Sequence, residues 1–163
     1  MKALLISAIL ATFCLGSVVL AMPAVGDYAA YDIVYDLGGG QVVTGTVEKE
    51  VTAFDVNAKS FSVKSSINFA GTNQTQTDVI AATSMVTDDG VSQLLTNCAA
   101  KGGTTEVLIV DKQSFNTCAI SSRSNGIDAK YWIGAVSFGL LKQVSANGTQ
   151  TLTLTLRTFK PGK

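Results

Sequence analysis

Thr151-Leu152-Thr153-Leu154-Thr155-Leu156, near the end of the chain, alternates polar and apolar side chains without exception. Successive side chains of a β-strand point to opposite faces of its sheet, so this segment predicts a strand with a buried leucine face and a hydrated threonine face. Sheets with one face in water are usually antiparallel, because parallel sheets are covered on both faces. The segment therefore predicts an antiparallel β protein.

The same period of two recurs earlier in the chain. Alternating segments lie at 31–37, 43–51 and 61–69. Between the first two, Gly38-Gly39-Gly40 predicts a hairpin turn, and the pairs Asn125-Gly126 and Asn147-Gly148 suit tight hairpins because both residue types tolerate positive φ. No internal repeat, charge run or linker interrupts the pattern. We therefore expect a single domain.

One segment departs from this period and predicts a short helix at about 89–101. Its apolar residues fall at helical spacing: Val91, Leu94, Leu95 and Cys98. Asp88 or Asp89 is a candidate N-cap, and Gly102-Gly103 is a candidate end. The predicted fold is thus mostly β, an antiparallel barrel or half-barrel of about eight to ten strands with one short helix.

Residues 1–21 have the layout of a secretory signal peptide. Lys2 precedes an apolar run, and the small residue Ala21 is the expected cleavage point. An uncleaved membrane anchor is the alternative, because the run approaches the length of a membrane span. Lipoprotein processing at Cys14 is disfavoured by the bulky Phe13 before it.

Cleavage would leave residues 22–163 as a single β domain. This part of the chain holds no apolar stretch approaching 18 residues, so we expect no membrane span in the mature chain. The compact signal favours bacterial export, which places the protein in the periplasm or outside the cell. Two cysteines remain, Cys98 and Cys118, and an oxidising compartment favours a disulfide between them. A redox-active pair is the alternative, although no C-x-x-C spacing is present to lower a thiol pKa.

Composition excludes several classes of function. With 12 basic and 12 acidic residues the chain has no net charge, so we expect no nucleic acid as a partner. The chain has no histidine, which removes the usual catalytic triads and the commonest zinc ligand. The acidic pairs Asp88-Asp89 and Glu48 with Glu50 are typical of a solvated surface. We therefore expect no catalytic residue, no metal site and no cofactor, and a protein that is not an enzyme.

Aromatic side chains are the remaining candidates for a site. They are Tyr31, Tyr35, Tyr131, Trp132 and Phe138. On a strand, neighbouring residues point to opposite faces, so at least one member of the pair at 131–132 should pack inside. One interpretation is that these residues close the core of a barrel or sandwich. The other is that they line a cavity for an apolar ligand.

Three segments of the chain resemble a pattern found in bacterial envelope proteins. They are Val107–Phe115, Cys118–Ile120 and Tyr131–Lys142, together with an opening at Gly26-Asp27-Tyr28 and Tyr31. The pattern resembles that of poorly characterised periplasmic proteins and lipoproteins of the DUF3108-like group. That resemblance implies a curved half-barrel like that of lipoprotein and lipid carriers. It implies no catalytic residue.

Three functional hypotheses follow. The first is a non-catalytic envelope protein that binds a lipid or another apolar small molecule in the concave face of its sheet, in a cavity of at least roughly 300 Å³. The second is a structural or interaction protein that binds another envelope protein through an exposed apolar face. The third, an enzyme built on facing carboxylates, needs two acids across a cleft.

Overall fold

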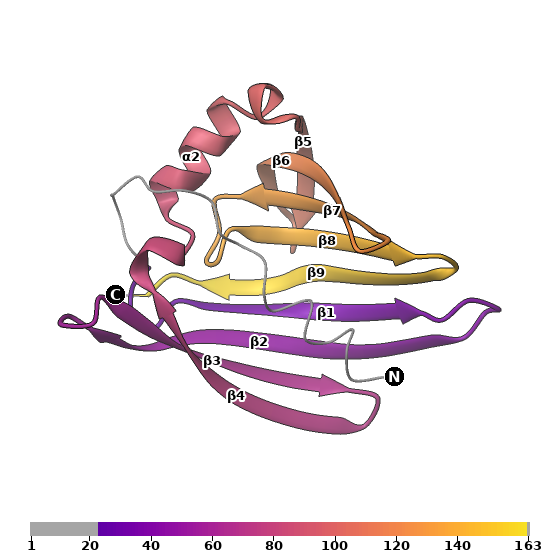
Figure 1. Ribbon diagram of the computed structural model, residues 1–163, viewed down its shortest axis with the longest axis horizontal. Coiled ribbons are helices and arrows are strands. Elements are labelled where there is room, and N and C mark those ends of the chain that lie inside the picture. The colour runs from indigo at the N-terminus through magenta and orange to yellow at the C-terminus, as the bar shows by residue number, and fades with distance from the viewer. Residues whose placement is uncertain (1–22, 163) are drawn as a thin grey trace.

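A computed structural model describes residues 23–162 as one antiparallel sheet with a short helix (Figure 1). The strands are β1 (Tyr28–Asp36), β2 (Val42–Asp55), β3 (Ser60–Phe69), β4 (Thr72–Ala81), β5 (Thr104–Val110), β6 (Gln113–Ser124), β7 (Ile127–Gly134), β8 (Leu140–Asn147) and β9 (Gln150–Lys160). The predicted mostly-β antiparallel fold with one short helix is confirmed. The predicted signal segment, 1–21, lies outside the described residues, so its cleavage stays a prediction.

The sheet joins two meanders through its first and last strands. The strand order is β4-β3-β2-β1-β9-β8-β7-β6-β5, so β1 pairs with β9 in the middle, and β4 and β5 are the two edges. Figure 1 shows β2, β1, β9 and β8 side by side, with β5 turned steeply across one end and the β3–β4 hairpin bent away at the other. β5 also contacts β9, which is not its neighbour in the sheet. The sheet is therefore strongly curled.

Local turn chemistry explains the hairpins. Asn125 and Gly126 both have positive φ, 51° and 78°, as a type I′ turn between β6 and β7 requires. All three glycines at 38–40 have positive φ in the loop between β1 and β2. Between β8 and β9, Asn147 pairs with Gln150, so Gly148 is the first residue of the two-residue turn there. The Asn147-Gly148 pair therefore marks that hairpin one position early.

The helix α2 (Asp88–Thr96) lies in the connection from β4 to β5 and contacts β6 and β7. Short 3₁₀ turns flank it, η1 (Ala82–Ser84) and η2 (Ala99–Lys101). Its N-cap is Thr87, whose Oγ1 accepts a 3.0 Å hydrogen bond from Gly90 N, and not the predicted Asp88 or Asp89. Cys98 follows the helix and forms the predicted disulfide with Cys118 on β6. Within the described part of the chain, no helix has the length and apolar character needed to cross a membrane.

Buried side chains form two clusters, which we call the large and the small cluster. The large cluster comprises Ala29, Tyr31, Ile33, Val47, Val110, Val136, Leu141, Leu152, Leu154 and Leu156. The small cluster comprises Val51, Phe61 and Val63. The residues that β1, β2, β3 and β9 contribute to these two clusters lie on one face of the sheet. We call it the inner face. The alternating leucines of β9 all belong to the large cluster, as the sequence predicts.

Candidate functional site

Lys49 interrupts the apolar inner face of β2. Val47 and Val51, two residues to either side of it, are 5% and 0% exposed, and Lys49 itself is half-buried beside its register partner Ala29 on β1. Burial removes water from the ammonium and lowers the pKa of Lys49, and the negative charge of Asp78 on β4 opposes that shift. Within the described residues, no carboxylate lies within 4.0 Å of this ammonium.

Ser65 interrupts the inner face of β3 directly opposite Lys49. It is 1% exposed and lies between buried Val63 and half-buried Ile67. Of the buried side-chain polar atoms in residues 23–162, its Oγ is the one without a hydrogen-bond partner. Such a group costs about 1–3 kcal/mol when buried, so an unpaired hydroxyl here needs an explanation.

Lys49 and Ser65 begin a row of polar side chains that continues across β4 to the edge of the sheet, and we call it the polar row. Gln76 of β4 is the register partner of Ser65, and its Nε2 donates a 2.9 Å hydrogen bond to Oδ2 of Asp78. Gln76 is exposed and Asp78 is half-buried. Lys49, Ser65 and Gln76 thus lie side by side on three adjacent strands, from the buried centre of the face to its open edge.

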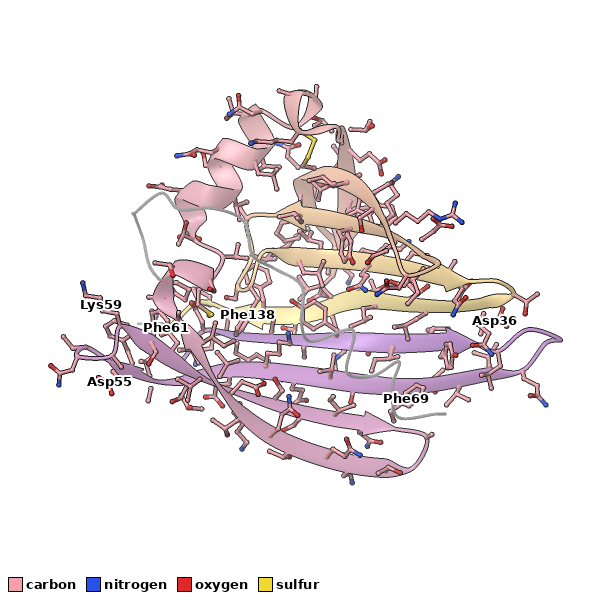
Figure 2. All side chains as sticks on the ribbon, viewed as in Figure 1. Asp36, Asp55, Lys59, Phe61, Phe69 and Phe138 are labelled. Carbon is pink, nitrogen blue, oxygen red and sulfur yellow. A yellow bond between two sulfur atoms is a disulfide. The ribbon has the colours of Figure 1, made fainter. Side chains whose placement is uncertain are left out.

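This polar row separates the two apolar clusters. Val47 on β2 belongs to the large cluster, and Ile67 on β3 packs against it. Val51 and Val63 belong to the small cluster. Phe138 is half-buried and packs against both. Figure 2 shows Phe138 and Phe61 near one end of the sheet and Phe69 toward the other. The inner face therefore offers apolar surface on both sides of a cation and an unpaired hydroxyl.

The tyrosines predicted on the first strand lie on the inner face. Tyr31 is 2% exposed within the large cluster, and burial raises the pKa of its hydroxyl. Tyr35 is half-buried, its ring centroid lies 6.3 Å from that of Phe69, and its hydroxyl donates a 2.6 Å hydrogen bond to Oε1 of Gln150. Tyr31 is thus a core residue, while Tyr35 keeps part of its ring uncovered.

Trp132 lies elsewhere, within a network of charged groups. It is 8% exposed, and the Nζ atoms of Lys130 and Lys142 lie 4.6 and 5.2 Å from its ring centroid. Its Nε1 donates a hydrogen bond to Glu106. Tyr131, its neighbour on β7, is half-buried and pairs in register with Gln143. The five predicted aromatic residues therefore do not converge on one site.

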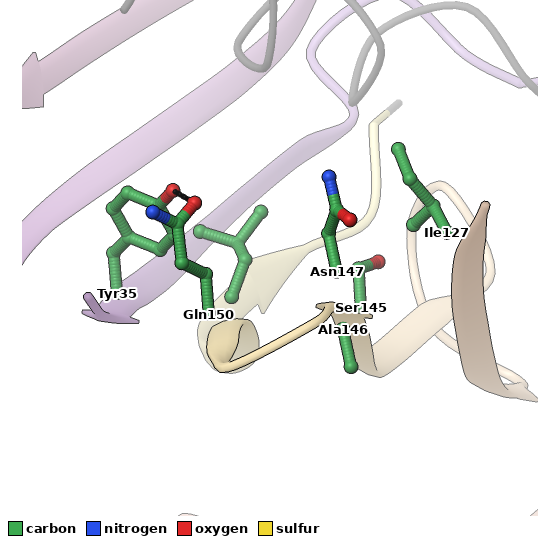
Figure 3. Close-up of a pocket in the computed structure, with 7 residues that line it drawn as sticks. Tyr35, Ile127, Ser145, Ala146, Asn147 and Gln150 are labelled. Atoms are coloured by element: carbon green, nitrogen blue, oxygen red, sulfur yellow. Dashed lines mark hydrogen bonds between the residues drawn. The ribbon is translucent and has the colours of Figure 1, made fainter. Parts of the chain in front are cut away.

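A hollow lined by described residues lies where β8 ends and β9 begins (Figure 3). It is partly open to solvent, and its cavity volume is about 10 Å³. Its lining residues are Tyr35, Ile127, Ser145, Ala146, Asn147, Gln150 and Leu152. Among the predicted aromatic residues only Tyr35 contributes to it. This volume has room for about one water molecule and is far below the roughly 300 Å³ expected of a ligand pocket.

No protein-family model and no curated protein sequence matches the chain. The solved structures similar to it include the following two. One is a β-barrel-like protein of the domain of unknown function DUF1849 from Brucella abortus, at 11% identity and a TM-score of 0.45, covering 88% of this chain and 100% of that one. The other is a LolA superfamily protein from Nitrosomonas europaea, at 6% identity and a TM-score of 0.26, covering 88% and 89%. TM-scores this low transfer neither a site nor a function, and the resemblance to DUF3108-like proteins stays a prediction.

Proposed function

We propose that this chain is an exported envelope protein that holds a lipid or another apolar ligand against the inner face of its curled sheet, without catalysing a reaction. The observation that carries the proposal is the incomplete covering of that face. Large apolar side chains that pack on the large cluster are only half-buried by the chain itself, among them Tyr35, Ile67, Phe69 and Phe138. Each further Å² of apolar surface removed from water contributes roughly 25 cal/mol, so an apolar ligand gains by covering them.

Two features support export. The segment 1–21 has the order of a basic start, an apolar run and a small-residue end, which is typical of a signal peptide. The bond between Cys98 and Cys118 is typical of oxidising compartments. The proposal therefore includes cleavage after Ala21, a mature domain of residues 22–163, and a place in the periplasm or outside the cell.

Native mass spectrometry of the protein isolated from its own envelope tests this proposal. We expect the mass of the cleaved, oxidised chain plus a lipid or another apolar molecule that organic extraction removes. Ile67→Ser, on the inner face, should reduce the occupied fraction severalfold. Val34→Ser is the matched control, because Val34 alternates with Ile33 and Tyr35 on the opposite face of β1 and is 41% exposed. A bare chain, or equal occupancy in both variants, would refute ligand binding on this face.

A second candidate function rests on the edge strand β5. Val107 and Ile109 lie on the same face of this strand and are 62% and 74% exposed. An edge strand also presents unpaired backbone groups, to which a strand of another protein can add. The candidate is an interaction protein that binds another envelope component there. Cross-linking tests this candidate. We expect the unmodified chain to capture a partner protein and the Ile109→Lys variant to lose it.

A further inference from the structure

We propose that Lys49 and Ser65 form a headgroup site on the inner face and that the ligand is a long-chain carboxylate, the chemical class of the fatty acids. This inference rests on the proposed function, because it assigns a chemistry to the ligand held there. It starts from the juxtaposition of one cation and one unpaired hydroxyl between two apolar clusters.

The first step concerns the charge of Lys49. An ammonium between Val47 and Val51 loses hydration, and a methionine or leucine there would join the two clusters without that cost. The described chain supplies no carboxylate within 4.0 Å to compensate the charge. Asp78, on the edge strand two strands away, is the acidic group that acts on it at longer range. The anionic group of a ligand therefore supplies the negative charge that the described residues do not place beside Lys49.

The second step concerns Ser65. Side chains directly opposite each other on antiparallel strands have Cβ atoms about 4.5–5.5 Å apart, so Lys49 and Ser65 can reach the same small group. The Ser65 hydroxyl is a donor with no partner among the described residues. Lys49 has a long flexible stem, so it is the neighbour that can move to admit an anion beside Ser65. One carboxylate oxygen then accepts from the ammonium and the other accepts from the hydroxyl.

The third step selects the anion. A carboxylate carries one negative charge, which a single lysine neutralises. A phosphate monoester carries about −1.5 to −2 at neutral pH and would leave negative charge uncompensated near Asp78. Charge balance on the inner face therefore favours the carboxylate.

The fourth step places the aliphatic chain. On the side of the small cluster, Val51 and Val63 are already 0% and 3% exposed. On the side of the large cluster, Ile67, Phe69 and Tyr35 are only half-buried. Half-buried Phe54 and Ile80 also pack on the small cluster, but the buried pair Val51 and Val63 lies between them and Lys49. The half-buried surface next to Lys49 and Ser65 therefore lies on the side of the large cluster, and the chain of the ligand extends from Lys49 over Ile67 toward Phe69 and Tyr35.

Calorimetric titration of the delipidated full domain with three probes of equal chain length tests the inference. The probes are dodecanoate, dodecanol and dodecyl phosphate at neutral pH, the two anions below their micelle concentrations and dodecanol below its solubility limit. We expect dodecanoate to bind about 10- to 100-fold more tightly than dodecanol, since one partner of the hydrogen bonds is charged. Dodecyl phosphate should bind more weakly than dodecanoate.

Substitutions locate the effect. Lys49→Met should remove the preference for dodecanoate over dodecanol, and Ser65→Ala should weaken dodecanoate binding severalfold. Lys64→Met is the matched control, because Lys64 is exposed and its side chain points to the opposite face from that of Ser65. Thermal unfolding confirms that each variant is folded, and Lys49→Gln repeats the loss of charge with a polar side chain.

The outcomes separate the two proposals. Equal affinity for dodecanoate and dodecanol, or an unchanged preference in Lys49→Met, would overturn the headgroup site and leave apolar binding intact. Tighter binding of dodecyl phosphate would overturn the choice of a carboxylate. Failure of all three probes to bind would overturn the headgroup site together with the proposed function.

Discussion

The indole Nε1 of Trp132 donates a 2.6 Å hydrogen bond to Oε2 of Glu106, a residue on the edge strand β5. The other carboxylate oxygen accepts a 2.8 Å hydrogen bond from Nζ of Lys130. Trp132 and Lys130 both lie on β7, so one carboxylate joins β5 to β7 across the intervening strand β6. The hydrogen bonds from Lys130 and Trp132 lower the pKa of Glu106.

Glu106→Gln should therefore destabilise the fold at neutral pH and have little effect in acid. A carboxyl group with a lowered pKa in the folded state stabilises that state above its unfolded pKa, about 4.3, and this contribution is lost as the pH falls through the folded value. Urea unfolding at several pH values measures the difference between the variant and the unmodified chain. Glu50→Gln, at an exposed position, is the control. A constant difference at every pH would contradict the prediction.

Replacing both bonded cysteines, Cys98→Ala with Cys118→Ala, should lower the free energy of unfolding by about 3 kcal/mol. The bond closes a loop with a sequence separation of 20, and opening it restores conformational entropy to the unfolded chain. Guanidinium unfolding of the double variant measures the loss, and the unmodified chain in reductant should show the same loss. An unchanged midpoint after thiol titration has shown complete reduction would count against it.

Gly103→Ala should destabilise the chain through the disulfide itself. A Cβ at this position would lie 2.6 Å from Sγ of Cys118 and 2.8 Å from Sγ of Cys98, closer than packed atoms allow. We expect a loss of about 1–3 kcal/mol, as for other overpacked sites. In the background of the double cysteine-to-alanine variant most of this cost should disappear, because the two sulfur atoms are gone. An equal cost in both backgrounds would locate the strain in the backbone.

The period of two predicted the strands because it reports which face of each strand is buried. Three local signals each marked an observed feature of the fold. The leucines of 151–156 lie on β9, the glycines at 38–40 lie in the turn between β1 and β2, and the helical spacing before Cys98 corresponds to α2. The predicted N-cap, Asp88 or Asp89, was one or two residues too late, because Thr87 has the extended backbone and the side-chain hydrogen bond of a cap. Local pattern does not report pairing between distant strands, so the contact of β1 with β9 was not predicted.

The sequence shows each interruption of the apolar pattern in the polar row, but it does not show that the interruptions lie side by side. Lys49 falls within the apolar series of Val47 and Val51, and Ser65 falls within that of Val63 and Ile67. Each interruption alone is unremarkable in a strand. Their significance depends on register, which pairs position 49 with position 65 and is set by the hairpin between β2 and β3. The bond between Trp132 and Glu106 spans β6 and had no sequence signal.

Lys49→Met should raise the free energy of unfolding at neutral pH by about 1–2 kcal/mol, because an apolar side chain of similar length replaces a poorly compensated buried charge. Burial lowers the pKa of Lys49 in the folded state. Between that value and the unfolded value, about 10.4, the unfolded chain binds more protons, so the unmodified protein gains stability as the pH rises. The advantage of the variant should therefore narrow in this window. Denaturant unfolding of both chains from neutral to alkaline pH measures this narrowing, with Lys64→Met, which removes a lysine at an exposed position, as the matched control.

A variant that is more stable but has lost its preference for a carboxylate would show why Lys49 occupies a position that packing alone would assign to a hydrophobic residue. Stabilising substitutions at binding sites commonly reduce function, since such sites hold charges that only the ligand compensates. Added dodecanoate should then stabilise the unmodified chain more than Lys49→Met, in proportion to its affinity for each. If Lys49→Met is less stable than the unmodified chain at neutral pH, the ammonium contributes to the fold itself, and the charge needs no ligand to account for it.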